Sequence, residues 1–154
     1  MPPDAPVRHD WVQLGEGWEG HLRSPLTAED RDEVEGWRWR GLPLVVARRQ
    51  PADGEDDLRL GLALPDKRRL GVHVAASAAV AHADPPALTA ALASAPEAWR
   101  PRLGAVVRLA NELGAPARVF GSLAWQHLSG LRYLRPDSDV DLLEFIPISN
   151  KLCL

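Results

Sequence analysis

The sequence predicts an α+β protein, with a small β-rich N-terminal domain followed by a domain in which helices and strands alternate. Three observations support this fold class. Leucines and valines alternate with other residues over 58–64 and 70–74, which is the period-two pattern of strands buried on one face. Apolar residues over 101–113 recur instead with helical spacing. Finally, a short apolar strand ends at the Gly-Ser pair 121–122 and is followed by an Asp-x-Asp run at 139–141.

The composition is that of an ordinary globular protein. The 154 residues are 45% hydrophobic and 25% charged, which suffices for a core in one or two domains. The net charge is −3 and the longest basic run is Lys67-Arg68-Arg69, so the electrostatic basis for nucleic-acid binding is missing. Cys153 is the single cysteine, which excludes an intrachain disulfide, and no stretch resembles a signal peptide or a membrane span. We therefore expect a cytoplasmic protein that binds neither nucleic acid nor membrane.

The first domain is expected to open with a short strand at residues 11–14. The glycines that follow, at 15, 17 and 20, spell G-x-G-x-x-G. A dinucleotide fingerprint needs a helix that opens on its last glycine. Ser24 and Pro25 come too soon for such a helix, so we expect a turn-rich loop here.

A short acidic helix is predicted next, with Thr27 as its N-cap and Gly36 as its end. Trp37 and Trp39 alternate with arginines, which is typical of a strand, and two tryptophans on one strand face are usually core residues. The apolar run 42–47 continues this strand character.

A β-hairpin follows. Residues 58–64 and 70–74 are its strands, and the linking Pro65–Arg69 segment has the composition of a solvated turn.

A domain boundary is predicted near residue 84. Small residues dominate positions 75–83, and Asp84-Pro85-Pro86 then supplies an N-cap and first-turn prolines. We predict a first domain at 1–83, a second at 84–145 and an atypical tail at 146–154. The tail holds both isoleucines, the only cysteine and one of the two lysines. A gene end interrupted near Phe145 and a simple variation of composition both explain this tail.

Two helices are expected to open the second domain, at residues 86–94 and 101–113. Gly114 would end the second of them. Its apolar face is predicted to consist of Leu103, Val106, Val107, Ala110 and Leu113.

The Gly-Ser pair is the strongest candidate for a phosphate-binding corner. Residues 118–120 are predicted to form a strand, and a helix is expected to open at Leu123. Free backbone N–H groups and the positive end of the helix dipole would then point out of the corner, where Gly121 allows close approach and Ser122 adds a small donor.

Asp139 and Asp141 are the candidate metal ligands. On a strand, residues two apart share one face, so both carboxylates would point one way while Val140 and Leu142 point the other. Paired carboxylates of this kind suit Mg²⁺. Taken alone, the Gly-Ser pair is a structural turn and the aspartates are a solvent-facing edge; their joint occurrence favours the functional interpretation.

Other site types fit less well. Asp137, Asp139 and Asp141 imitate the start of a calcium loop, but the required glycine and glutamate are replaced by Leu142 and Ile148. Ser122 lacks the flanking glycines of a nucleophile elbow. The five histidines show no paired ligand spacing.

Gly-Ser followed by Asp-x-Asp resembles the signature of nucleotidyltransferases related to DNA polymerase β. The longer run from Arg118 to Leu143 is similar to one family of them, the phosphoribosyl-dephospho-CoA transferase of malonate decarboxylase, also called its holo-acyl-carrier-protein synthase. A looser likeness extends upstream through residues 8–10, 43–49 and 61–67. The matching pieces of the close run are Val119–Gln126, Ser129–Leu131, Tyr133-Leu134 and Ser138–Leu143.

The resemblance implies a Mg²⁺-dependent nucleotidyltransferase. Its donor would be triphosphoribosyl-dephospho-CoA, its acceptor a serine of the malonate decarboxylase acyl-carrier subunit, and its by-product pyrophosphate. Asp139 and Asp141 would be the catalytic metal ligands, and Gly121 and Ser122 would bind the phosphates. The fold implied is a β-rich N-terminal domain followed by the first part of a polymerase-β-like domain.

The chain departs from this superfamily in one respect. A third carboxylate usually follows on a later strand, but the sequence ends thirteen residues after Asp141, and strand geometry would turn Glu144 to the opposite face. We therefore expect a C-terminally truncated chain. Two alternatives stay open: a nucleotidyltransferase that adenylylates a protein or small molecule, and an inactive remnant that only binds carrier protein or nucleotide.

Overall fold

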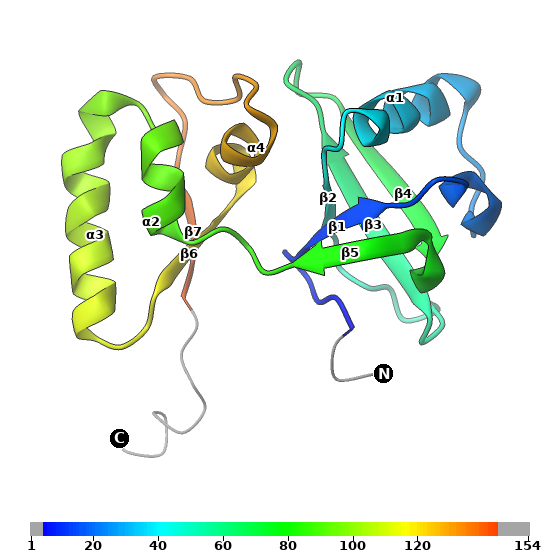
Figure 1. Ribbon diagram of the computed structural model, residues 1–154, viewed down its shortest axis with the longest axis horizontal. Coiled ribbons are helices and arrows are strands. Elements are labelled where there is room, and N and C mark those ends of the chain that lie inside the picture. The colour runs from blue at the N-terminus through cyan, green and yellow to red at the C-terminus, as the bar shows by residue number, and fades with distance from the viewer. Residues whose placement is uncertain (1–4, 145–154) are drawn as a thin grey trace. The chain divides into compact units, whose positions relative to one another are not determined.

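The computed structural model of the protein describes residues 5–144. Helices and antiparallel sheets are both present, which confirms the α+β prediction. The chain divides into two units, Met1–Asp84 and Pro85–Leu154 (Figure 1). In the part of the chain that the structure describes, no helix is both long and apolar enough to cross a membrane.

The first unit is built on a five-stranded antiparallel sheet. The strand order is β4-β3-β2-β1-β5, and β1 pairs with both β2 and β5. The core lies on one face of this sheet, as the burial of alternate strand residues indicates. The strands are β1 (Trp11–Leu14), β2 (Leu44–Val46), β3 (Asp57–Ala63), β4 (Arg69–Ala75) and β5 (Ala79–Ala83).

The predicted hairpin is confirmed by the pairing of β3 with β4. Leu60 lies opposite Val72, and Leu62 opposite Leu70. Leu60 and Leu62 are each only 1% exposed, because period-two geometry directs them into the core. Lys67 adopts φ +79° in the turn that joins the strands.

Helix α1 (Ala28–Trp39) packs its inner face into the core of the first unit. Thr27 caps it as predicted, since its hydroxyl oxygen accepts a hydrogen bond from the Asp30 N–H at 3.1 Å. The predicted end at Gly36 is wrong. The helix continues to Trp39 and ends where Gly41, at φ +75°, donates its N–H to the Arg38 carbonyl.

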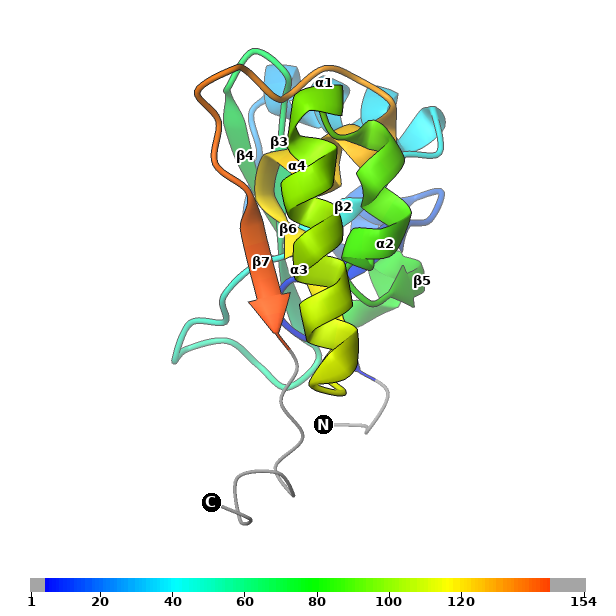
Figure 2. The same ribbon diagram turned by 90° about the vertical axis from the view of Figure 1, so that its left-hand side faces the viewer.

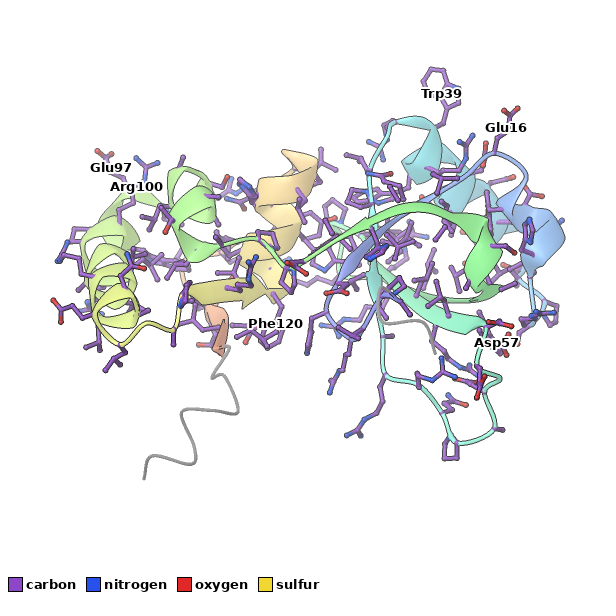
Figure 3. The ribbon with its side chains drawn as sticks, turned by 60° about the horizontal axis from the view of Figure 1, so that its bottom comes forward. Glu16, Trp39, Asp57, Glu97, Arg100 and Phe120 are labelled. Atoms are coloured by element: carbon purple, nitrogen blue, oxygen red, sulfur yellow. The ribbon has the colours of Figure 1, made fainter. Side chains whose placement is uncertain are left out.

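The prediction that Trp37 and Trp39 lie on one strand face is therefore also wrong. On a helix, Trp37 falls on the same face as Val34, three residues earlier, and the two are 1% and 0% exposed. Trp39 points away from that face and is 78% exposed (Figure 3).

The G-x-G-x-x-G segment is a loop, as expected. Gly17 has φ +78°, and a single turn of 3-10 helix follows at Trp18–His21. Trp18 is buried and donates its indole N–H to Glu35 at 2.8 Å, so this loop closes one end of the core.

The second unit combines a two-stranded sheet with three helices. β6 (Ala117–Phe120) and β7 (Asp141–Glu144) pair antiparallel and lie side by side (Figure 2). Helix α2 lies between α3 and α4 (Figure 1) and contacts both. The helices are α2 (Leu88–Ala91), α3 (Arg100–Glu112) and α4 (Gly121–Ser129).

The two helices predicted to open this unit are present with changed bounds. The first is short, because Ala87 forms a β-bridge with Arg118 and the last turn, Leu92–Ser94, is a 3-10 helix. The second ends as predicted: Gly114 has φ +67°, and the Ala115 N–H closes the end by donating to the Ala110 carbonyl.

The predicted apolar face of α3 is only partly buried. Leu103 and Ala110 are 7% exposed, but Leu113 is 68% exposed because it lies at the C-cap, beyond the last helical turn.

Candidate functional site

The candidate site is centred on Gly121, where β6 passes into α4. The chain turns there with φ +69°, a conformation that favours glycine, and α4 begins at this residue rather than at Leu123. The pairing of Phe120 with Asp141 brings β7 to the same point. A Cβ atom on Gly121 would collide with the Asp141 carboxylate. Glycine is thus required here for two separate reasons, its backbone conformation and the close approach of a carboxylate.

The beginning of α4 is open to a ligand. No side chain caps it, and no acidic residue lies in its first turn. Leu123 and Ala124 are fully buried and fix the helix in the core of this unit. Ser122 is half-buried, and its hydroxyl makes no hydrogen bond to the described residues. The first-turn N–H groups and this hydroxyl can therefore donate to an anion at the positive end of the helix dipole.

The structure brings Asp141 to this corner but places Asp139 differently from the prediction. β7 begins at Asp141, so Asp139 lies in the segment that leads into the strand and not on it. The reason is that β6 offers no partner beyond Phe120, where its chain turns into α4. Both aspartates are exposed. Leu142 is 36% exposed, so the apolar side of β7 is only partly covered within residues 5–144.

A carboxylate beside an uncapped helix N-terminus, with the exposed Asp139 two residues before it in the sequence, suits a Mg²⁺ ion that would also bind substrate phosphates. Proteins commonly hold Mg²⁺ with one or two carboxylates and leave its other positions to phosphates and water. Among the described residues no cluster of three or more metal-ligating side chains occurs. The side chain of Glu144, the tail at 146–154 and the proposed interruption at Phe145 lie outside those residues.

Gln126 organises the loop between α4 and the aspartates, and sequence reasoning did not single it out. Its side-chain oxygen accepts hydrogen bonds from the N–H groups of Tyr133 and Leu134 at 3.0 and 2.9 Å. Its side-chain amide donates to the Ser94 carbonyl at 2.6 Å. The only sequence signal was its place in the run that resembles a known family.

Aromatic stacking and a second polar contact reinforce this loop. Trp125 stacks on Tyr133 with 6.0 Å between ring centroids and 23° between planes. Ser94 also contacts the Nδ1 atom of His127 at 3.1 Å. Together with Gly130, which ends α4 at φ +73°, these contacts shape the loop that leads from α4 to β7, whose first residue is Asp141.

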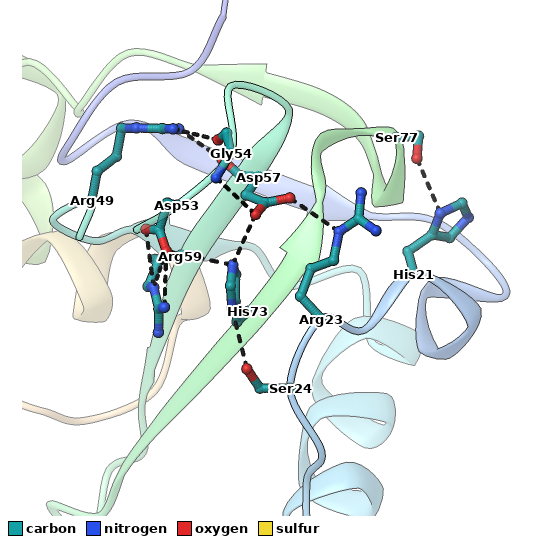
Figure 4. A network of polar contacts seen from close by, with 10 residues as sticks. All are labelled: His21, Arg23, Ser24, Arg49, Asp53, Gly54, Asp57, Arg59, His73 and Ser77. Atoms are coloured by element: carbon teal, nitrogen blue, oxygen red, sulfur yellow. Dashed lines mark hydrogen bonds and ion pairs between the residues drawn. The ribbon is translucent and has the colours of Figure 1, made fainter. Parts of the chain in front are cut away.

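A separate polar network in the first unit is a structural feature. Asp53 pairs with Arg59 at 2.9 Å, and Asp57 pairs with Arg23 at 3.0 Å (Figure 4). The Arg59 guanidinium, followed by the Gln50 N–H, lowers the pKa of Asp53 to about 2. Because both carboxylates are neutralised by arginines, this network stabilises the loop before β3 rather than offering a metal site.

The basic turn of the hairpin is also committed to internal contacts. Arg68 pairs with Asp66 at 2.8 Å and with Glu33 of α1 at 2.7 Å. It therefore joins the turn to the helix.

Two family models match the chain. The model described as the phosphoribosyl-dephospho-CoA transferase MdcG N-terminal domain matches residues 7–85, and the one described as the MdcG C-terminal domain matches residues 87–152. No solved structure matches the chain significantly.

Curated relatives carry the same name. A phosphoribosyl-dephospho-CoA transferase of Xanthomonas axonopodis pv. citri is 33% identical over 146 residues, which cover 93% of this chain and 66% of the relative. A relative from Bradyrhizobium diazoefficiens is 37% identical over 144 residues, which cover 90% of this chain and 62% of the relative. A relative from Xanthomonas campestris pv. campestris is 36% identical over 121 residues, which cover 77% of this chain and 57% of the relative.

The chain thus spans between 57% and 66% of the length of these relatives. The N-terminal model alone matches just over half of the chain, and the C-terminal model follows it directly. The chain therefore belongs to the MdcG family of phosphoribosyl-dephospho-CoA transferases, as its run from Arg118 to Leu143 predicted.

Proposed function

We propose that the protein transfers the phosphoribosyl-dephospho-CoA group from triphosphoribosyl-dephospho-CoA to a serine of the malonate decarboxylase acyl-carrier subunit and releases pyrophosphate. The observation that carries this proposal is the Asp141 carboxylate against Gly121 at the uncapped start of α4. A helix end that can bind an anion, beside a carboxylate that could hold a metal ion, suits phosphoryl transfer. The relatives' name then supplies the transferred group.

The residues of the corner have separate tasks in this proposal. The N–H groups at the start of α4 and the Ser122 hydroxyl donate hydrogen bonds to the donor's phosphate oxygens and hold the triphosphate in line. The serine oxygen of the carrier attacks the phosphorus next to the ribose, the bond to the bridging oxygen breaks, and pyrophosphate leaves as the serine loses its proton. Orientation and charge stabilisation account for most of the catalysis in such a transfer.

Asp139 and Asp141 would hold Mg²⁺ in this proposal. The bound ion would offset negative charge on the phosphates. Because both carboxylates are exposed, they reach the ligand without a change of the core.

The test is a transfer assay in which the full chain is incubated with labelled triphosphoribosyl-dephospho-CoA and the apo carrier subunit. Asp141→Asn should reduce the transfer rate about 100-fold or more, because one charged ligand of the site is lost. Asp137→Asn, an exposed aspartate of the same segment, is the matched control and should transfer normally. An Asp141→Asn rate equal to that of the control would exclude the assignment.

Two other functions are distinguished by the same assay. Transfer from ATP instead of triphosphoribosyl-dephospho-CoA would identify an adenylylating enzyme. Binding of carrier or nucleotide without transfer from either donor would identify a non-catalytic protein.

A further inference from the structure

The second unit contains a hollow that is separate from the corner at Gly121, because neither Gly121 nor Asp141 lines it. It has a volume of about 710 Å³. Its walls are the segment from Ala93 to Arg100, the loop from Gly130 to Pro136, and Gln126 of α4. The size is within the range of small-molecule sites, which are usually pre-formed concave surfaces.

The rim of this hollow is positively charged. Arg100, Arg132 and Arg135 line it, against the single acidic side chain of Glu97. Arg132 and Arg135 are exposed, and their guanidinium groups make no ion pair with the described residues. Although the whole chain has a net charge of −3, three arginines line this one concave surface, so its local charge is positive.

Arg100 is held in place rather than free to move. Its guanidinium donates to the carbonyls of Ala95 and Ala93, each at 3.2 Å. Figure 3 shows Arg100, the first residue of α3, close to Glu97 of the 3-10 turn that precedes the helix.

The floor of the hollow is mainly apolar. Ala95 is buried, Leu134 is 5% exposed, and the half-buried Trp99 adds an aromatic surface. A ligand that satisfies both parts must combine a flat apolar ring with adjacent anionic groups. A nucleoside diphosphate has this chemistry, because its base stacks on aromatic or apolar surfaces while its phosphates accept bidentate hydrogen bonds from arginine.

We propose that this hollow binds the adenosine diphosphate portion of a dephospho-CoA group, with the base on the Trp99 floor and the diphosphate on Arg132 and Arg135. This inference rests on the proposed function for the identity of the ligand. Gly121 and Gly130 lie at opposite ends of α4, roughly 13 Å apart at 1.5 Å per residue. The donor carries phosphates on both sides of its adenosine, so one molecule can extend along α4 from the hollow to the corner.

The test measures ADP binding by titration calorimetry without metal ions and without carrier protein. The double variant Arg132→Ala/Arg135→Ala should bind ADP about 30- to 100-fold more weakly than the unaltered chain, since two charge-assisted contacts are lost. The matched control is Arg102→Ala/Arg108→Ala, which removes two exposed arginines of α3 that do not line the hollow. The control should retain the affinity for ADP, and dephospho-CoA should compete with ADP.

Adenosine and pyrophosphate, tested separately, should each bind at least tenfold more weakly than ADP. Equal binding of pyrophosphate and ADP would overturn the nucleotide assignment, and so would ADP affinity that is unchanged in the double variant. The Asp141→Asn chain keeps the two proposals distinct, because it should lose transfer and still bind ADP. Normal transfer with no ADP binding would refute the hollow alone.

Discussion

At the scale of single residues, Gly121 is the position on which the site depends most. It combines a left-handed backbone with a carboxylate oxygen of Asp141 close to where a Cβ atom would lie. Gly114, at the end of α3, has nearly the same φ, but no atom lies within 4 Å of where its Cβ atom would be. Comparing the same substitution at these two glycines therefore separates the effect of backbone strain from the effect of contact with Asp141.

We predict that Gly121→Ala weakens binding of pyrophosphate in the presence of Mg²⁺ by at least tenfold, because the new methyl group displaces the Asp141 carboxylate. Gly114→Ala is the control and should only destabilise the fold by about 1–2 kcal/mol, the cost of a left-handed non-glycine residue. Calorimetry and urea denaturation of both variants check this. Equal losses of affinity in the two variants would show that strain alone is responsible.

A second prediction at this scale concerns acid stability. The pKa of Asp53 is lowered from 3.8 to about 2 by the Arg59 guanidinium and the Gln50 N–H. A carboxyl group whose pKa is lowered by folding stabilises the fold at every pH above its pKa in the unfolded chain. That contribution is lost as the pH falls towards the pKa in the folded protein, about 2.

The unaltered protein should therefore be more stable than Asp53→Asn at pH 5, and the difference should shrink between pH 4 and pH 2. Denaturation curves of the two proteins over this range measure it. A difference that does not change with pH would contradict the assigned ion pair.

At the scale of elements, the loop between α4 and β7 leads into the strand that places Asp141 at the corner. Gln126 ties this loop to α4 and to the turn at Ser94 through three hydrogen bonds. Its neighbour Trp125 holds Tyr133 by stacking. The loop is thus positioned by the helix whose first residue is Gly121.

We predict that Gln126→Ala destabilises the second unit by about 2–3 kcal/mol, at roughly 1 kcal/mol for each lost hydrogen bond. The amides of Tyr133 and Leu134 should exchange faster with deuterium. Gln126→Glu keeps an acceptor oxygen for both amides but places a second oxygen opposite the Ser94 carbonyl, so it should preserve more protection of the two amides than Gln126→Ala does. Equal exchange in the Ala and Glu variants would exclude this role.

At the scale of the whole molecule, each unit has its own sheet. The first unit closes its core with strands from both ends of its sequence, because β1 pairs with β5 just before Asp84. In the second unit, β7 pairs with β6 alone among the residues that the structure describes. The two units should therefore differ in how well they stand alone.

We predict that residues 1–84 fold when expressed alone, with a cooperative urea transition, because the sheet and α1 supply a complete core. Trp18 and Trp37 are fully buried there and should report the transition by fluorescence. Ending the chain at residue 78 provides the control, since it removes β5 and should abolish cooperativity. A gradual transition for residues 1–84 would show that the second unit is needed.

The sequence by itself determined the features that depend on neighbouring residues. Period-two burial on β3 and β4 and the Thr27 cap were correctly predicted, because strand alternation and capping are local. The run from Arg118 to Leu143 also identified the family that the matching models show.

Tertiary structure decided the features that depend on distant partners. The end of α1 at Trp39, the burial of Trp37 and the exposure of Trp39 follow from packing into the core of the first unit, since both a strand and a helix fit the local pattern there. The strand position of Asp141, but not of Asp139, follows from where β6 turns away at Phe120. Asp141 and Gly121 are twenty residues apart in the sequence and come into contact only because β6 and β7 pair. The register of that pairing is set by interactions between the two strands, which the sequence of either strand alone does not specify.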